Sequence, residues 1–270
     1  MRGTRISRFG QIQIYVGKCF RMFRNEKGWK VLISAAIITL IISSVTGENT
    51  FVAAQDTRNG AFALVCACIW VGIFNSIQSI CRERAIIKRE HRTGLHISSY
   101  MIAHMIYELV ICLMETVIVT LIMYFANRDH FPETGVFFPP LLELMITFFL
   151  FIYSSDVLGL LVSGIVKNEN TAMTVMPLIP IVQLVMSGMI FALEGAPKMI
   201  ANFTISKWGV NAICVTADVN SLVGALPDYE ADYEFSEPHL MKLWLILLAF
   251  AALYGILSII VLEFVDRDKR

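Results

Sequence analysis

Residues 60–125 read GAFALVCACIWVGIFNSIQSICRERAIIKREHRTGLHISSYMIAHMIYELVICLMETVIVTLIMYF. This stretch contains two long apolar runs, 60–81 and 97–125, on either side of a short segment that is dense in charge. A helix of about 20 apolar residues crosses the hydrocarbon core of a bilayer. Each run is long enough for this, so the stretch predicts two membrane-spanning helices joined by a charged loop.

The rest of the 270-residue chain continues this pattern. Hydrophobic residues make up 56% of it and charged residues 16%, whereas soluble domains have about 45–50% and about 25%. The sequence therefore predicts an all-α integral membrane protein with six spans. The spans are expected at about 29–46, 60–81, 97–125, 137–166, 171–193 and 240–264.

The basic residues predict how these spans are oriented, because Lys and Arg gather in cytoplasmic segments. An even number of spans places both ends of the chain on one side of the membrane. If that side is the cytoplasm, 17 of the 22 Lys and Arg residues lie in cytoplasmic segments. We therefore expect both termini to be cytoplasmic, in a multi-pass protein of the cell membrane.

An amphipathic helix is expected in front of the first span, within residues 1–28. Its apolar side chains recur at intervals of three and four, as on one face of a helix. They are Ile6, Phe9, Ile12, Val16, Phe20 and Phe23. Arg8, Lys18 and Arg21 lie roughly opposite. Such a helix lies in the membrane interface, with its apolar face in lipid and its basic face toward the cytosol.

Motifs for nucleotide binding and for hydrolysis do not occur in these 270 residues. There is no G-x-x-x-x-G-K-[ST], no H-E-x-x-H and no G-x-S-x-G. The six cysteines match no zinc or redox spacing. We therefore expect no catalytic residue, no metal site and no cofactor bound by this chain itself. An ATP-driven step would need ATP and Mg on another protein or domain.

The most specific segment is the charged loop between the second and third spans. It reads CRERAIIKREHRTG from Cys81 to Gly94 and is followed by Ser98, Tyr100 and Glu108. Alternating charges beside a short apolar strip suit a helix lying along the inner membrane face. The alternative is a generic basic loop that only fixes the topology.

This segment resembles the coupling segment of ABC-2 type membrane domains in the ABC transporter G subfamily, the white-type and pleiotropic drug resistance-type half-transporters. A second resemblance follows in the order that this subfamily has: SGMIF at 187–191, at the end of the fifth span, and ISKWGVNA at 205–212. Two ordered matches in a six-span frame are more specific than either alone. The resemblance implies a connecting helix at 1–28, an ABC-2 type transmembrane domain at 29–266, and short re-entrant helices in an outer loop at 194–238.

The resemblance also implies roles for particular residues. Those expected to contact the ATPase are Arg82, Glu83, Arg84, Lys88, Arg89 and Glu90. Those expected along the translocation path are Trp70, Val71, Phe74 and Asn75 on the second span and Ile181, Leu184, Ser187 and Gly188 on the fifth. Met189 and Ile190 occupy the place of an apolar plug. Each path or plug residue, taken singly, could equally serve only to pack helices.

Four acidic residues fall within the expected spans: Glu108, Glu115, Glu143 and Asp156. An isolated charge there costs about 2.5–3.5 kcal/mol on insertion scales. Each carboxyl therefore needs a partner, a proton or water. His104 precedes Glu108 by one turn and could pair with it. A proton relay and purely structural polar contacts both remain open.

The first functional hypothesis is the permease of an ATP-driven ABC-2 type exporter, which moves a hydrophobic, amphipathic or lipid-like substrate outward. G-subfamily half-transporters carry an ATPase domain at their N-terminus, so here we expect that domain on a separate chain or on a missing part of a longer protein. The other expected partners are a second permease chain, which would form a homodimer or a heterodimer, and the lipid bilayer. We expect no nucleic acid partner. The alternatives are a membrane anchor or sensor subunit that does not transport, and a secondary carrier driven by protons or ions.

Overall fold

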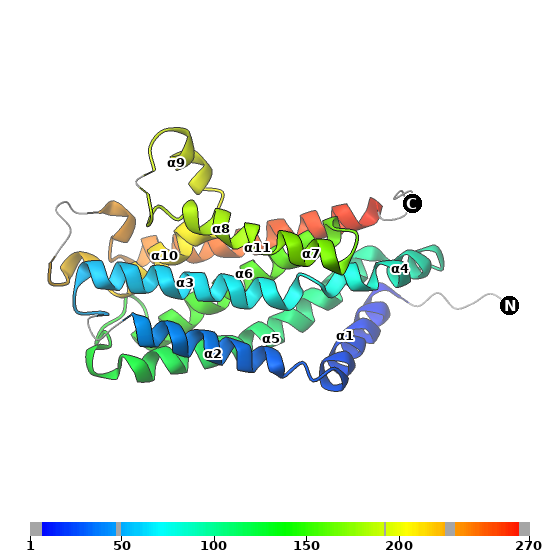
Figure 1. The fold of residues 1–270 in the computed structure, drawn as a ribbon, viewed down its shortest axis with the longest axis horizontal. Coiled ribbons are helices and arrows are strands. Elements are labelled where there is room, and N and C mark those ends of the chain that lie inside the picture. Colours follow the sequence, from blue (N-terminus) through cyan, green and yellow to red (C-terminus); the bar gives the residue numbers. More distant parts are fainter. Residues whose placement is uncertain (1–6, 47–49, 192, 225–229, 265–270) are drawn as a thin grey trace.

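A computed structural model of the chain describes residues 7–46, 50–191, 193–224 and 230–264. This described part is helical, with no strand and one isolated parallel bridge between Ala53 and Val223. Five helices lie side by side along the long axis of the molecule (Figure 1). They are α2 (Lys30–Val45), α3 (Ala54–Ser76), α5 (Ile97–Ala126), α6 (Pro140–Ile165) and α11 (Glu237–Glu263).

Helix α6 is the centre of the bundle and packs against α3, α5, α11 and α10 (Ile205–Thr216). Its contact with α3 depends on glycine, because a Cβ atom on Gly72 would lie 2.6 Å from the carbonyl oxygen of Ile152 and 2.8 Å from the Cβ of Ser155. Small residues that let two backbones approach closely are typical of membrane helix pairs. Gly72 therefore sets the distance between α3 and α6.

Side-chain hydrogen bonds also join α6 to its neighbours. Ser76 Oγ of α3 donates to the Asp156 carbonyl at 2.7 Å, and Ser154 Oγ donates to the Leu247 carbonyl of α11 at 2.8 Å. Polar side chains that bond across helices replace the water that an apolar interior lacks. The core is thus held by short polar links as well as by apolar packing.

Length and composition qualify four helical stretches as membrane spans: 54–92, 97–126, 140–165 and 237–263. They correspond to the second, third, fourth and sixth expected spans. A fifth is reached if α1 (Arg8–Asn25) and α2, which are bent by 69° relative to each other, count together. Six spans therefore remain a prediction.

The fifth expected span, 171–193, is not one continuous helix. The structure has two short helices here, α7 (Glu169–Val175) and α8 (Leu178–Val185). Pro177 lies at the break, and proline lacks the N–H that a continuous helix would use. After α8 the backbone turns at Gly188, whose φ of +81° is one that glycine adopts without strain.

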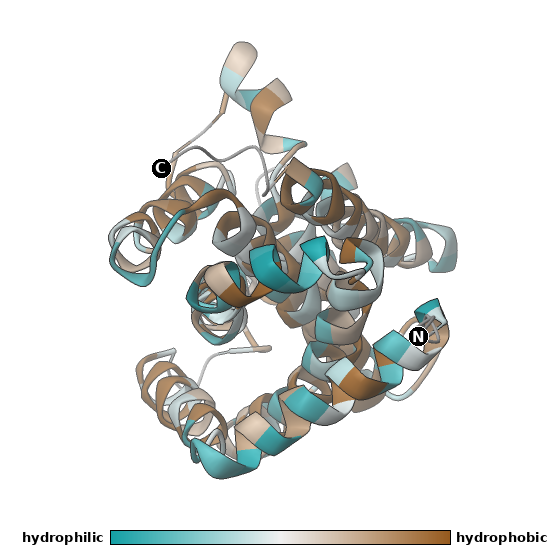
Figure 2. Cartoon of the chain, turned by 90° about the vertical axis from the view of Figure 1, so that its right-hand side faces the viewer, coloured by the Kyte–Doolittle hydropathy of each residue, from teal (hydrophilic) through white to brown (hydrophobic). Residues whose placement is uncertain are grey.

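The remaining elements divide between the two ends of the bundle. Helix α1, helix α4 (Ser79–Arg92) and the last turns of α11 lie at the right in Figure 1, which we call the α4 end. Figure 2 looks onto this end, where hydrophilic (teal) segments are prominent. The opposite end holds α9 (Ala196–Ala201), α10, η1 (Arg128–His130), η2 (Val219–Ser221) and η3 (Ala231–Tyr233).

Some parts of the expected segments lie outside the described residues. These are 1–6 of the connecting helix, 192 of the fifth span, 225–229 of the outer loop, and 47–49 and 265–266 of the transmembrane domain. Within the described part, α1 is the expected connecting helix, and α9 with α10 are the expected short helices. How deeply α9 and α10 enter a membrane is still a prediction, as is the side of the membrane on which the α4 end lies.

Candidate functional site: the coupling helix and its anchors

The charged loop of the sequence is the helix α4. It follows α3 after only two residues and continues in nearly the same direction, so that 54–92 forms a single helical stretch (Figure 1). The expectation of a helix lying along the inner membrane face is therefore wrong. Helix α4 extends the second span beyond the bundle, and α1 and the end of α6 lie against its sides.

Glu83 attaches α4 to α1. It is only 6% exposed, and its Oε2 accepts a hydrogen bond from Lys18 Nζ at 2.8 Å and from the Tyr100 hydroxyl at 3.0 Å. A buried carboxylate is costly unless it is paired and hydrogen-bonded. Lys18 was expected on the basic, cytosolic face of α1, and the structure corrects this because the side chain turns inward to supply that pair.

Three further contacts join the same two helices. The Tyr15 hydroxyl donates to Glu90 Oε2 at 2.5 Å, and both terminal nitrogens of Arg82 donate to the two carboxylate oxygens of Glu26 at 2.7 Å. At the end of α4, Gln11 accepts from the His96 N–H at 3.0 Å and donates to the Gly94 carbonyl at 3.1 Å. Helix α1 is thus bound to α4 and the turn after it along most of its length.

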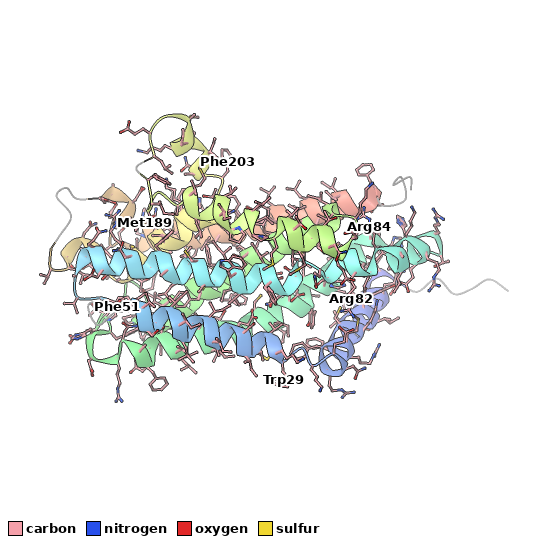
Figure 3. All side chains as sticks on the ribbon, viewed as in Figure 1. Trp29, Phe51, Arg82, Arg84, Met189 and Phe203 are labelled. Carbon is pink, nitrogen blue, oxygen red and sulfur yellow. The ribbon has the colours of Figure 1, made fainter. Side chains whose placement is uncertain are left out.

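A second set of contacts joins α4 to α6. Arg84 Nη1 donates to the carbonyl oxygens of Gly164 and Val166, at 2.7 and 3.1 Å. Ser163 Oγ accepts from the N–H groups of Ile80 and Cys81, at 3.0 Å each. Figure 3 shows Arg82 and Arg84 on opposite sides of the helix, toward α1 and toward α7 respectively. Helix α4 therefore lies clamped between α1 and the end of α6.

One face of α4 is left exposed. Its members follow at intervals of three and four residues, as on one helical face. They are Arg82, Ala85, Ile86, Arg89 and Arg92. Arg89 makes no hydrogen bond or ion pair with any described residue.

The structure thus divides the six predicted coupling residues into two groups. Glu83, Arg84 and Glu90 bind groups of this chain, and Lys88 is half-buried. Arg82 is exposed although it also binds Glu26 of this chain, and Arg89 is exposed without such a bond among the described residues. The role of these residues in contacting an ATPase stays a prediction.

The residues predicted for the translocation path lie on the neighbouring helices α3 and α8 and in the turn that follows α8. Phe74 and Ile181 are 52% and 53% exposed, and Trp70 is exposed too. Val71 by contrast is buried in the core. Asn75 is half-buried, and its Nδ2 donates to Glu115 Oε1 at 2.7 Å.

The last turn of α8 and the segment directly after it carry the remaining predicted path and plug residues. Ser187 is buried and Leu184 half-buried, and the Ser187 hydroxyl donates to the Leu184 carbonyl at 2.7 Å. Met189 is half-buried, with its sulfur 4.0 Å from the Tyr233 hydroxyl. Burial raises the pKa of Tyr233, which keeps this hydroxyl protonated as a donor. Gly188 and Ile190 are exposed, so the two plug residues differ in environment.

Residues 10–217 match the family described as ABC-2 type transporter. The chain belongs to this family. It is also similar to the ABC transporter ATP-binding/permease protein Rv1747 of Mycobacterium tuberculosis (strain ATCC 25618 / H37Rv), with 25% identity over 228 residues. The alignment covers 80% of this chain and 26% of that protein. The chain therefore spans about a quarter of the length of this relative.

The predicted ABC-2 type membrane domain is confirmed by this match. An ABC-2 membrane domain is the permease part of a transporter and is not catalytic itself. The chain is accordingly a multi-pass membrane protein that carries the membrane domain of an ABC-2 type transporter.

Two of the intramembrane acids in this ABC-2 domain have partners. Glu143 lies in the first turn of α6, where its Oε1 accepts from the Phe137 N–H and, at 2.9 Å, from the Phe138 N–H. This carboxylate closes the loop before α6 and lies at the end of the bundle opposite α4. Glu115 is bonded to Asn75, as described above.

The other two acids lack such bonds. The Asp156 carboxylate is fully buried and has no hydrogen-bond partner among the described residues. Glu108 lies one turn after His104, yet no hydrogen bond joins the two within the described part of the chain. His104 Nε2 lies instead 3.9 Å from Cys19 Sγ. The pairing expected from the spacing is therefore not present.

Sequence reasoning missed the anchors on α1 and α6. Gln11, Tyr15, Lys18 and Glu26 lie on one face of α1, since they follow at helical intervals. That spacing could have indicated a polar face turned toward protein. Nothing in the sequence singled out Ser163, because a lone serine in an apolar run is common in membrane helices.

Proposed function

We propose that this chain is the permease of an ATP-driven exporter of the G-subfamily type, with six spans, cytoplasmic termini and an inward-facing α4. The exposed face of α4, which includes Ile86 and Arg89, would receive the ATPase. The observation that carries this proposal is the double anchoring of α4, through Glu83 to α1 and through Arg84 to α6. ATP and Mg would be bound by the partner ATPase and not by this chain.

Both anchors can transmit a displacement of α4. A push on α4 acts on the end of α6 through the Arg84 bonds, and α6 packs against α3, α5 and α11. The exposed Glu26–Arg82 pair can break and re-form cheaply, since surface pairs contribute about 0–1 kcal/mol. The more buried Lys18–Glu83 pair would hold α1 to α4 throughout the cycle.

Whether the ATPase is fused to this chain or lies on a separate chain can be argued only by analogy with relatives. The mycobacterial relative is named as an ATP-binding and permease protein, so both activities are named on one longer chain. An ATPase fused to this permease and an ATPase on a separate chain both fit the proposal.

A second permease chain would complete the pathway. Apolar side chains of α3 and α8, among them Trp70, Phe74 and Ile181, are exposed on the single chain. Apolar helix surface within a membrane can pack against a second chain as well as against lipid. We place the homodimer contact and the path here, which suits a hydrophobic or amphipathic substrate that is moved outward.

Co-purification tests this proposal. The tagged chain is recovered from its native membrane as the wild type, as the Ile86→Asp/Arg89→Glu variant, and as a Leu121→Ala control at an exposed site on α5. We expect an ATPase to be recovered with the wild type and the control, and to be lost with the α4 variant. Stimulation of that ATPase by a hydrophobic substrate would separate an exporter from a membrane anchor. Recovery of no ATPase in any sample would overturn the proposal.

A further inference from the structure

A cavity of about 260 Å³ opens at the α4 end, between α1, the first turn of α2, the end of α3 and α5. Phe23, Phe74 and Ile111 form apolar parts of its wall. Asn75 and Glu108 provide polar groups. Ligand sites are typically hollows of this mixed kind, mostly apolar with a few placed polar groups.

Most of the charge in this wall is already compensated. Glu26 and Arg82 form a two-bond pair at 2.7 Å, and Glu83 is paired with Lys18 at 2.8 Å. Glu108 differs, because it is 2% exposed and has no hydrogen bond or ion pair with any described residue. A buried carboxylate without a partner is costly. The cavity therefore presents one uncompensated acid to whatever fills it.

We propose that this cavity binds a small amphipathic amine. The ammonium group would donate its hydrogens to the Glu108 carboxylate, in charge-assisted hydrogen bonds stronger than neutral ones. The apolar body of the amine would lie against Phe23, Phe74 and Ile111. The aromatic ring of Tyr107, also in the wall, offers a face on which a cation is attracted.

A metal ion fits this wall less well. Among the described residues, no group of three or more His, Cys, Asp or Glu side chains could hold a metal. Divalent cations such as Ca²⁺ need about six to eight oxygen ligands. Here the apolar wall around one free acid matches an organic cation. This site lies within a single chain. It shares Phe74 and Asn75 with the predicted path and goes beyond the proposed function, since a permease could work without an amine site.

The test measures thermal unfolding of the purified chain in detergent, with intrinsic tryptophan fluorescence as readout. The probe is 2-phenylethylamine, and 2-phenylethanol is its neutral counterpart. A ligand that binds the folded state raises the unfolding midpoint, by an amount that grows with the logarithm of the ligand concentration relative to its Kd. We expect a dose-dependent rise with the amine and none with the alcohol. Glu108→Gln should weaken the apparent affinity at least tenfold, and Phe74→Ala several-fold.

The matched control is Leu113→Ala, an exposed position on α5 that does not line the cavity. It should respond to the amine as the wild type does. Equal shifts with the amine and the alcohol would overturn the proposal, because they would mean an apolar pocket in which Glu108 carries no charge. An unchanged amine response of Glu108→Gln would overturn it as well.

A second measurement covers the case in which Glu108→Gln does not fold. Photolabelling of the wild type with an azide derivative of 2-phenylethylamine should mark peptides that contain cavity-lining residues, such as those around Phe23, Phe74 and Ile111, and 2-phenylethylamine should compete while 2-phenylethanol should not. Labelling elsewhere, or competition by both compounds, would contradict the proposal. Because Glu108 is buried on α5, and because Ile86 and Arg89, which would receive the ATPase, do not line the cavity, Glu108→Gln should still recover the ATPase. Loss of amine binding is thereby distinguishable from failure of the proposed function.

Discussion

The guanidinium of Arg84 on α4 closes the end of α6, with Nη1 lying 2.7 Å from the carbonyl oxygen of Gly164. The last carbonyls of a helix have no partner within it, and a cation placed there also matches the helix dipole. Arg84 therefore supplies a missing donor to α6 and a fixed link to α4. It was predicted as a contact for another protein, and its side chain is bound within this one.

Arg84→Ala should lower the unfolding free energy by about 1.5–3 kcal/mol, since the hydrogen bonds lost involve a charged group. Arg84→Lys should recover part of this, because an ammonium is a point donor and cannot reproduce the planar fork. Thermal unfolding of the purified chain measures both. Arg89→Ala, on the exposed face of the same helix, is the control and should leave the midpoint unchanged. If Arg84→Ala unfolds at the wild-type midpoint, the link does not contribute to stability.

Removing either partner of the Lys18–Glu83 pair should destabilise the protein to a different extent. Lys18→Met leaves a carboxylate that is 6% exposed, with the Tyr100 hydroxyl as its one remaining partner among the described residues. Glu83→Gln instead leaves a lysine side chain that is 29% exposed and can be hydrated. We expect Lys18→Met to cost about 1–3 kcal/mol and Glu83→Gln less.

The double variant should be more stable than the sum of the two single changes predicts, by about 0.5–3 kcal/mol, because the residues interact directly. A complete double-mutant cycle in detergent gives this coupling energy. Strictly additive losses would show that the two side chains act independently.

The close approach of α3 and α6 at Gly72 predicts that a larger side chain there destabilises the fold. Gly72→Ala places a methyl group 2.6 Å from the Ile152 carbonyl, and that backbone atom cannot move aside without shifting α6. Overpacking of this kind costs about 1–3 kcal/mol. Gly17→Ala on α1 is the matched control, because there the new Cβ lies 3.5 Å from the flexible Arg21 side chain.

In the control, the helix preference for alanine should stabilise by up to about 1 kcal/mol. The two substitutions are chemically identical, so their difference in unfolding midpoint isolates the packing term. Equal midpoints would mean that α3 and α6 approach less closely than the structure shows.

The sequence predicted what depends on composition along the chain and missed what depends on contacts across it. Apolar runs of sufficient length predicted α3, α5, α6 and α11, because lipid imposes that length locally. The dense charge of 82–92 indicated a short helix along the inner membrane face; the helix is present, but it continues α3. The partner of Glu83 could not be predicted, since Lys18 lies 65 positions earlier and hydropathy treats it as surface. The break of the fifth span had a local signal, Pro177, whereas the cavity beside Glu108 arises only when α1 and α5 come together.

Gln183 on α8 holds the start of α10 in place. Its Oε1 accepts from the N–H groups of Ile205 and Ser206, at 3.0 and 3.3 Å, and the Ser206 hydroxyl donates to the Gln183 carbonyl. Gln183→Leu keeps the volume but leaves two buried donors without an acceptor, which costs about 1–3 kcal/mol for each group left unsatisfied.

The loss should be local, so hydrogen exchange at the first turn of α10 is the sensitive measurement. We expect faster exchange at Ile205 and Ser206 in Gln183→Leu, with little change in α5. Gln55→Ala is the control, since that amide is exposed and bonds only to Asn59 at 3.3 Å among the described residues. Unchanged exchange at α10 in Gln183→Leu would mean that the start of this helix is held by packing alone, and that the short helices of the fifth span do not position it.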